Sequence, residues 1–178
     1  KMADLIYNGK AYAQFGADTL KIEAGQMTLI DNNTDGVFEV VVINEYENCY
    51  VLGTDTRNER VYGKYGDSVT LSDYDISKIY TADGQETTFD AISSGQVLTV
   101  MKSLDASTIS VYINTQRVNA NITQIEDTGK TMKFTTDSGN VYELAENVKN
   151  AIAEGKVGAE TPEIGGSYTF VLDLYGKV

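Results

Sequence analysis

The sequence has no histidine, no tryptophan, one cysteine and one proline. Without histidine, Ser-His-Asp catalysis, Cys-His catalysis and the common histidine-containing zinc sites are excluded. Cys49 has no second cysteine with which to form an internal disulfide, so the cysteine count leaves the cellular compartment open. A reactive thiol needs a neighbouring histidine or cation, and the charged neighbours of Cys49 in the sequence are acidic, so we expect Cys49 to be a packed strand residue.

Basic residues are also few. The chain has 14 Lys and Arg against 26 Asp and Glu, a net charge of −12. Nucleic acids and anionic membranes both require a basic surface, which argues against either as a partner. No apolar run approaches the ~20 residues of a membrane helix, so we expect no membrane insertion.

The length of 178 residues and the hydrophobic content of 42% predict a globular protein of one large or two small domains. The sequence starts at Lys1 without an initiator Met and stops at Val178 just after a strand-like run. We therefore expect it to be a fragment of a longer protein.

Short β-branched or alternating runs fill most of the chain, and turn dipeptides separate them. These dipeptides are Asn8-Gly9, Asp35-Gly36, Asp83-Gly84, Thr128-Gly129, Ser138-Gly139 and Tyr175-Gly176. The pattern predicts an all-β protein of two small antiparallel barrel- or sandwich-like domains, 1–77 and 78–178. Leu144, Val148 and Ile152 have helical spacing, so one short helix is expected near 144–154 as an insertion in the second domain.

A weak internal repeat is visible as well. Gly25, Gly95 and Gly165 are 70 residues apart, and each is followed by a polar or small residue and then a strand-like run. A repeat of this kind predicts two β units and the end of a third, or two barrels with exchanged edge strands.

The most specific motif is the acidic loop 31–39, which has the form D-x-N-x-D-G-x-x-E between two apolar runs. Calcium prefers several oxygen ligands from such a loop. Its candidate ligands are the side chains of Asp31, Asn33, Asp35 and Glu39 and the carbonyl of Val37. An EF-hand is excluded, because its twelfth position is a valine and strands flank the loop. A strand-loop-strand Ca²⁺ site and a plain hairpin turn both remain open.

No motif selects a catalytic residue. The second acidic cluster, Asp67, Asp73 and Asp75, is typical of a solvated turn. Six tyrosines in the middle of the chain could instead stack on sugar rings, which makes a polysaccharide-binding module the alternative function. They are Tyr46, Tyr50, Tyr62, Tyr65, Tyr74 and Tyr80.

The stretch from Leu29 to Tyr46 reads apolar strand, Asp-Asn-x-x-Asp-Gly, apolar strand, Glu-Tyr. It resembles a recurring segment in the β-rich repeat regions of Gram-positive cell-surface proteins that carry S-layer homology domains elsewhere. The run Phe89–Val100 is similar to other units of those regions. The S-layer homology domain itself is absent from this chain. The resemblance implies secretion, a cell-surface location in the wall and no catalysis.

Together these observations predict a non-catalytic structural or interaction module of an exported bacterial surface protein. Calcium at 31–39 would stiffen it. Its expected partners are cell-wall or surface components, or neighbouring domains of the same chain.

Overall fold

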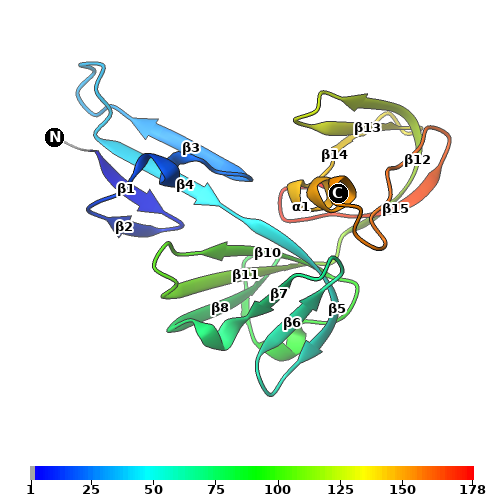
Figure 1. Cartoon of the computed structure of the whole chain (residues 1–178), viewed down its shortest axis with the longest axis horizontal. Coiled ribbons are helices and arrows are strands. Elements are labelled where there is room, and N and C mark those ends of the chain that lie inside the picture. Colours follow the sequence, from blue (N-terminus) through cyan, green and yellow to red (C-terminus); the bar gives the residue numbers. More distant parts are fainter. Residues whose placement is uncertain (1–2) are drawn as a thin grey trace.

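A computed structural model describes residues 3–178 and shows a mainly β protein (Figure 1). Three sheets account for the fold, and the described range contains one α-helix, α1 (Glu146–Ala153). The all-β class and the short helix near 144–154 are confirmed.

The N-terminal sheet has the strand order β2-β1-β4-β3. Its strands are β1 (Asp4–Tyr7), β2 (Lys10–Tyr12), β3 (Gly25–Ile30) and β4 (Val40–Glu45). The central sheet has the order β7-β6-β5-β10-β11-β8-β9. Its strands are β5 (Glu47–Asp55), β6 (Arg60–Gly63), β7 (Ser68–Thr70), β8 (Ile76–Thr81), β9 (Glu86–Thr87), β10 (Val97–Lys102) and β11 (Thr108–Asn114). The C-terminal sheet has the order β14-β13-β12-β15. Its strands are β12 (Arg117–Asp127), β13 (Met132–Thr136), β14 (Val141–Glu143) and β15 (Ser167–Val171).

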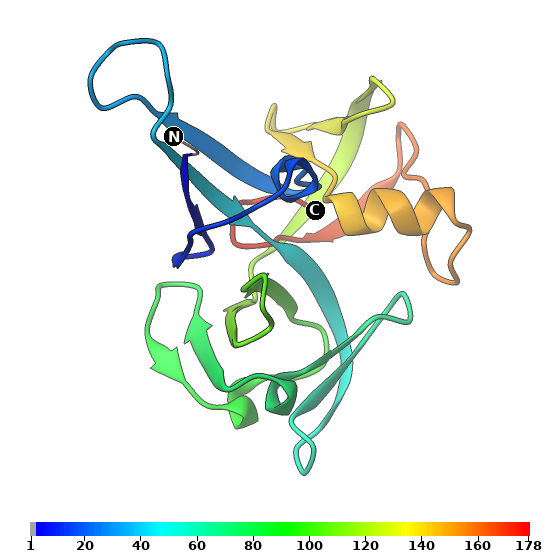
Figure 2. The same cartoon turned by 60° about the vertical axis from the view of Figure 1, so that its left-hand side comes forward.

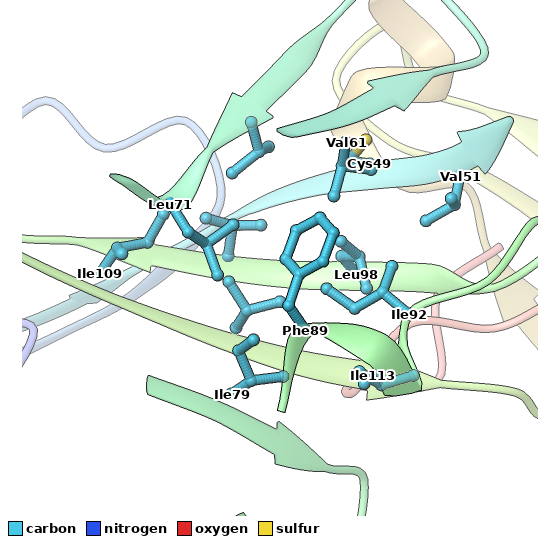
Figure 3. Packing of buried hydrophobic residues seen from close by; sticks show 13 residues of the cluster. Cys49, Val51, Val61, Leu71, Ile79, Phe89, Ile92, Leu98, Ile109 and Ile113 are labelled. Carbon is cyan, nitrogen blue, oxygen red and sulfur yellow. The ribbon is translucent and has the colours of Figure 1, made fainter. Parts of the chain in front are cut away.

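The central sheet has the most complete hydrophobic core. Alternate residues of β11, namely Ile109, Val111 and Ile113, are buried on one face, as the period of two requires. Phe89, from a 3₁₀ helix, points into the middle of this cluster, and strands lie on both sides of it (Figure 3). Thirteen buried residues form this core, with Tyr74 partly buried against it.

Strands continue from one sheet into the next. Only Tyr46 separates β4 from β5, and only residues 115–116 separate β11 from β12. The first pair runs diagonally from the N-terminal into the central sheet (Figure 1 and Figure 2). No flexible linker therefore separates these sheets along the chain.

The N-terminal sheet is also held to the β10–β11 turn by side chains. The ammonium group of Lys10 pairs with the Asp105 carboxylate and donates to the Ser107 hydroxyl at 2.6 Å. The backbone N–H of Leu104 donates to the hydroxyl of Tyr12 at 2.9 Å. The turn between β10 and β11 is therefore a docking point for β2.

The predicted boundary after Ser77 lies inside β8, and the central sheet takes strands from both sides of it. The buried residues form three clusters, one for each sheet. Division into two independently folding domains stays a prediction.

Two of the three copies of the 70-residue repeat, those at Gly95 and Gly165, share the hydrogen bonding of their backbone. Gly95 N–H donates to the carbonyl of Val51 at 2.8 Å, and Gly165 N–H donates to the carbonyl of Ile122 at the same distance. In return, the N–H of Val51 donates to the carbonyl of Gln96 at 2.9 Å, and the N–H of Ile122 donates to the carbonyl of Gly166 at 3.0 Å. Both glycines have positive φ, +86° and +84°, a conformation that favours glycine.

A β-bulge also occurs at the corresponding place in two of the sheets. The β5–β6 ladder shifts register between Val51 and Gly53, and the β12–β13 ladder shifts between Ile122 and Gln124. The meander β12-β13-β14 with β15 therefore repeats β5-β6-β7 with β10.

The N-terminal sheet repeats the other half of the central one. The order β2-β1-β4-β3 matches β9-β8-β11-β10, with a parallel pair, β1–β4 or β8–β11, in the middle of each. The repeat unit thus has two halves that share β10: one is β5, β6 and β7 with β10, and the other is β8, β9 and β11 with β10. Only the central sheet contains both halves. Helix α1 starts 70 residues after the first residue of β8, so it takes the place of that strand. The helix was expected as an insertion, and it instead replaces a strand of the repeat.

Candidate functional site

The acidic loop joins β3 to β4, as the strand-loop-strand pattern predicts. Backbone N–H groups of Asn33, Thr34 and Gly36 donate to the Asp31 carboxylate at 3.2, 2.6 and 2.9 Å. These bonds, led by that from Gly36, lower the pKa of Asp31. Thr34 and Gly36 have positive φ, +62° and +84°, which bends the loop back over Asp31.

Three of the predicted ligands converge. Carboxylate oxygens of Asp31, Asp35 and Glu39 lie within 4.8 Å of one another. Because Ca²⁺ binds oxygen at ~2.3–2.6 Å, one ion could contact all three. Glu39 also accepts a hydrogen bond from the N–H of Asn32 at 2.7 Å, which fixes it over the loop.

Of the other two predicted ligands, the Asn33 side chain is hydrogen-bonded within the loop, and Val37 contributes its N–H there, not the predicted carbonyl. The side-chain oxygen of Asn33 accepts from the N–H of Asp35 at 2.9 Å, and its amide donates to the Asp35 carboxylate at 3.1 Å. The N–H of Val37 donates to the same carboxylate at 2.8 Å, while the side chain of Val37 is exposed. These hydrogen bonds also suit a plain hairpin turn, so the calcium assignment stays a prediction.

A cleft between α1 and β5 holds two adjoining cavities. The larger, of about 550 Å³, is rich in carboxylates. Those side chains are Glu23, Glu47, Asp67, Glu146 and Glu154. The smaller, of about 370 Å³, is lined by the cations Lys64, Arg117 and Lys177 and by Tyr50 and Tyr65, among others. Asn147 borders both cavities.

A buried polar chain behind this cleft was not predicted. Asn114 donates to the hydroxyl of Thr99 at 3.2 Å, and Thr99 donates to the side-chain oxygen of Asn48 at 3.0 Å. Asn48 in turn donates to the carboxylate of Asp173 at 2.8 Å. The signal in the sequence was a polar residue inside an apolar strand, which is costly to bury without a partner.

The tyrosines proposed as a sugar platform are in different environments. Tyr46 is buried and packs on Tyr175 with ring centroids 4.5 Å apart. Tyr80 stacks on Tyr112 at 5.1 Å, and Tyr62 is 43% exposed. Tyr50 and Tyr65 line the smaller cavity, with the ammonium of Lys64 5.7 and 5.4 Å from their ring centroids.

Cys49 is buried in β5, as expected of a packed strand residue. Burial, and secondarily the nearby Asp67 carboxylate, raises the pKa of its thiol. The predicted acidic cluster is divided: Asp67 lines the larger cavity, whereas Asp73 lies on a 3₁₀ helix and Asp75 is exposed.

No known protein family, curated protein or solved structure matches this chain. Within residues 3–178, no helix is both long and apolar enough to cross a membrane.

Proposed function

We propose that this chain is a non-catalytic structural and interaction module of an exported bacterial cell-surface protein. The repeat carries the proposal, because copies of one β unit are joined by strands that pass from sheet to sheet. Such a chain transmits force through strand pairing and acts as a stiff spacer. Its partners would be neighbouring units and cell-wall or surface components.

The acidic loop would add to this stiffness. An ion between Asp31, Asp35 and Glu39 would neutralise three carboxylates that lie close together. Because the loop joins the two longest strands of the N-terminal sheet, its order limits the motion of that sheet.

Stiffness is tested by small-angle scattering. Four flexible residues inserted after Tyr46 should increase the radius of gyration and broaden the distribution of distances. The same insertion after Arg57, in the β5–β6 turn, is the control and should change little. Scattering that already requires independent motion of the sheets in the unmodified chain would contradict the spacer proposal.

The cell-surface location is tested separately. Antibodies against this chain should label intact cells that produce the protein that contains it. Labelling only after lysis would refute the location without affecting the stiffness.

Polysaccharide binding remains the second candidate, because Tyr50 and Tyr65 line one cavity of the cleft. It predicts retention on insoluble cell-wall glycan that Tyr65→Ala removes. The exposed Tyr62 lies outside both cavities, so Tyr62→Ala is the matched control. Equal retention of both variants would eliminate this site.

A further inference from the structure

We propose that the open edge of β15 is a docking site for an antiparallel strand of the β11 type, supplied by another unit of this repeat. The inference rests on the repeat geometry and is independent of the cell-surface location. In the central sheet, β10 lies between β5 and β11. Its repeat counterpart β15 pairs with β12 on one side and is the last strand of its sheet.

The free backbone groups of β15 follow from its ladder. Leu172 N–H donates to the carbonyl of Gln116 at 3.0 Å. Because hydrogen-bonded and free positions alternate along an antiparallel strand, the N–H and C=O groups of Ser167, Thr169 and Val171 face away from β12. Among the described residues, no strand and no loop forms a backbone hydrogen bond with these outward-facing groups. An edge with unpaired donors and acceptors is a template for another strand.

The core beside β15 is also less complete than the central one. Six residues of the C-terminal cluster are buried and eight more hydrophobic residues are only partly buried. The central cluster has thirteen buried and one partly buried. A strand added beside β15 would cover the same side of the C-terminal core that β11 covers in the central core.

The repeat also identifies the sequence that fits. In the central sheet, Leu98 is opposite Ile113 and Val100 is opposite Val111. The residues 70 positions later are Tyr168 and Phe170, which belong to the C-terminal core. A strand with β-branched residues at the places of Val111 and Ile113 would therefore pack on Tyr168 and Phe170.

The test uses the whole chain and a peptide with the sequence of β11, Thr108–Asn114, flanked by lysines for solubility. With saturating peptide, amide exchange at Ser167, Thr169 and Val171 should slow by about tenfold or more. A peptide carrying proline at the position of Tyr112, which is opposite Thr99 and donates its N–H toward β10, cannot complete the ladder and should have no effect. No change with the β11 peptide would overturn the proposal.

A variant provides the second arm. Thr169→Pro removes an outward-facing N–H and leaves the β12 hydrogen bonds in place, so it should abolish peptide binding. Leu29→Pro makes the same change on the outer strand β3 of the N-terminal sheet and should leave binding unchanged. If Thr169→Pro does not fold, the comparison of the two peptides on the unmodified chain still decides the question.

Two other outcomes would also overturn the proposal. Protection of β15 that increases with protein concentration, without peptide, would identify an edge strand of a second copy as the occupant, because β4 and β11 of that copy are already paired on both sides. Equal slowing of amide exchange at β3 and β15 on addition of the peptide would show unselective binding to any free edge.

Discussion

The side-chain amide of Asn48 donates a 2.8 Å hydrogen bond to the carboxylate of Asp173, although 125 residues separate them. Both side chains are buried. Asp173 also accepts hydrogen bonds from the backbone N–H groups of Tyr175 and Lys177, each at 2.8 Å. This one carboxylate therefore shapes the C-terminal turn and fastens it to the central sheet.

Asp173→Ala should lower the free energy of unfolding by about 3 kcal/mol, because the buried Asn48 amide and two part-buried backbone N–H groups lose a charged acceptor. Urea denaturation measures the effect. The matched control is Asp90→Ala, which removes an exposed carboxylate from a 3₁₀ helix and should cost under about 0.5 kcal/mol. Equal losses would show that Asp173 makes no special contribution.

Calcium at millimolar concentration should release or absorb heat on titration and raise the melting temperature of the unmodified chain. Asp35→Ala should remove both effects, since it deletes one of three converging carboxylates. Asp83→Ala, in another Asp-Gly turn, is the control and should retain them. No heat and no thermal shift in the unmodified chain would leave the loop as a hairpin turn.

The pair formed by Lys10 and Asp105 makes stability depend on pH at both ends of the scale. The hydrogen bond from Lys10, with help from Ser107, lowers the pKa of Asp105. The stabilisation by Asp105 is therefore complete above the unfolded pKa of about 3.9 and is lost as the pH falls toward the folded value. The raised pKa of Lys10 has the opposite sign, so its contribution is complete below about pH 10.4 and is lost above that value.

Asp105→Asn should therefore flatten the fall in melting temperature below pH 4. Thermal melts between pH 2 and pH 7 measure this slope. Glu126→Gln, an exposed change on β12, should leave the slope as it is. An unchanged slope in Asp105→Asn would assign the acid sensitivity to other carboxylates.

Gly25 and Gly165 occupy related places in the repeat and differ in the space around them. A β-carbon at Gly25, where φ is +147°, would lie 2.1 Å from the carbonyl oxygen of Asn44. One at Gly165 would have no atom within 4 Å, although φ is +84°. Gly165→Ala should lower the free energy of unfolding by about 1–2 kcal/mol, because of the backbone conformation alone. Gly25→Ala should lower it further, because the β-carbon also clashes. Denaturant midpoints compare them, and equal costs would mean that the Asn44 backbone moves aside.

Cys49 should not react with a thiol reagent in the folded chain. Burial raises the pKa of its thiol, so both access and thiolate are lacking. The rate of modification should therefore follow unfolding as urea is added. Fast reaction in native buffer would show that β5 opens locally.

Local chemistry was readable from the sequence because it acts over a few residues. The glycines of the predicted turn dipeptides, from Gly9 to Gly176, all have positive φ. The stripe Leu144, Val148 and Ile152 predicted α1, and the lack of any group beside Cys49 that could activate its thiol predicted a packed strand residue. In the acidic loop, spacing alone brought Asp31, Asp35 and Glu39 together.

The partners of each strand were not readable in this way. Alternation with a period of two says which face of a strand is buried and nothing about which strand lies beside it. The parallel pairs β1–β4 and β8–β11, and the position of Ser77 inside a sheet, follow from contacts between distant segments.

The sequence by itself determined the β class, the turns, the helix and the period of 70 residues, because each depends on neighbours along the chain. Only the tertiary structure decided that the middle unit is complete, that β15 has an open edge and that Asn48 meets Asp173. Those features depend on chain segments that meet only after folding, when burial makes a missing strand or an unpaired polar group costly.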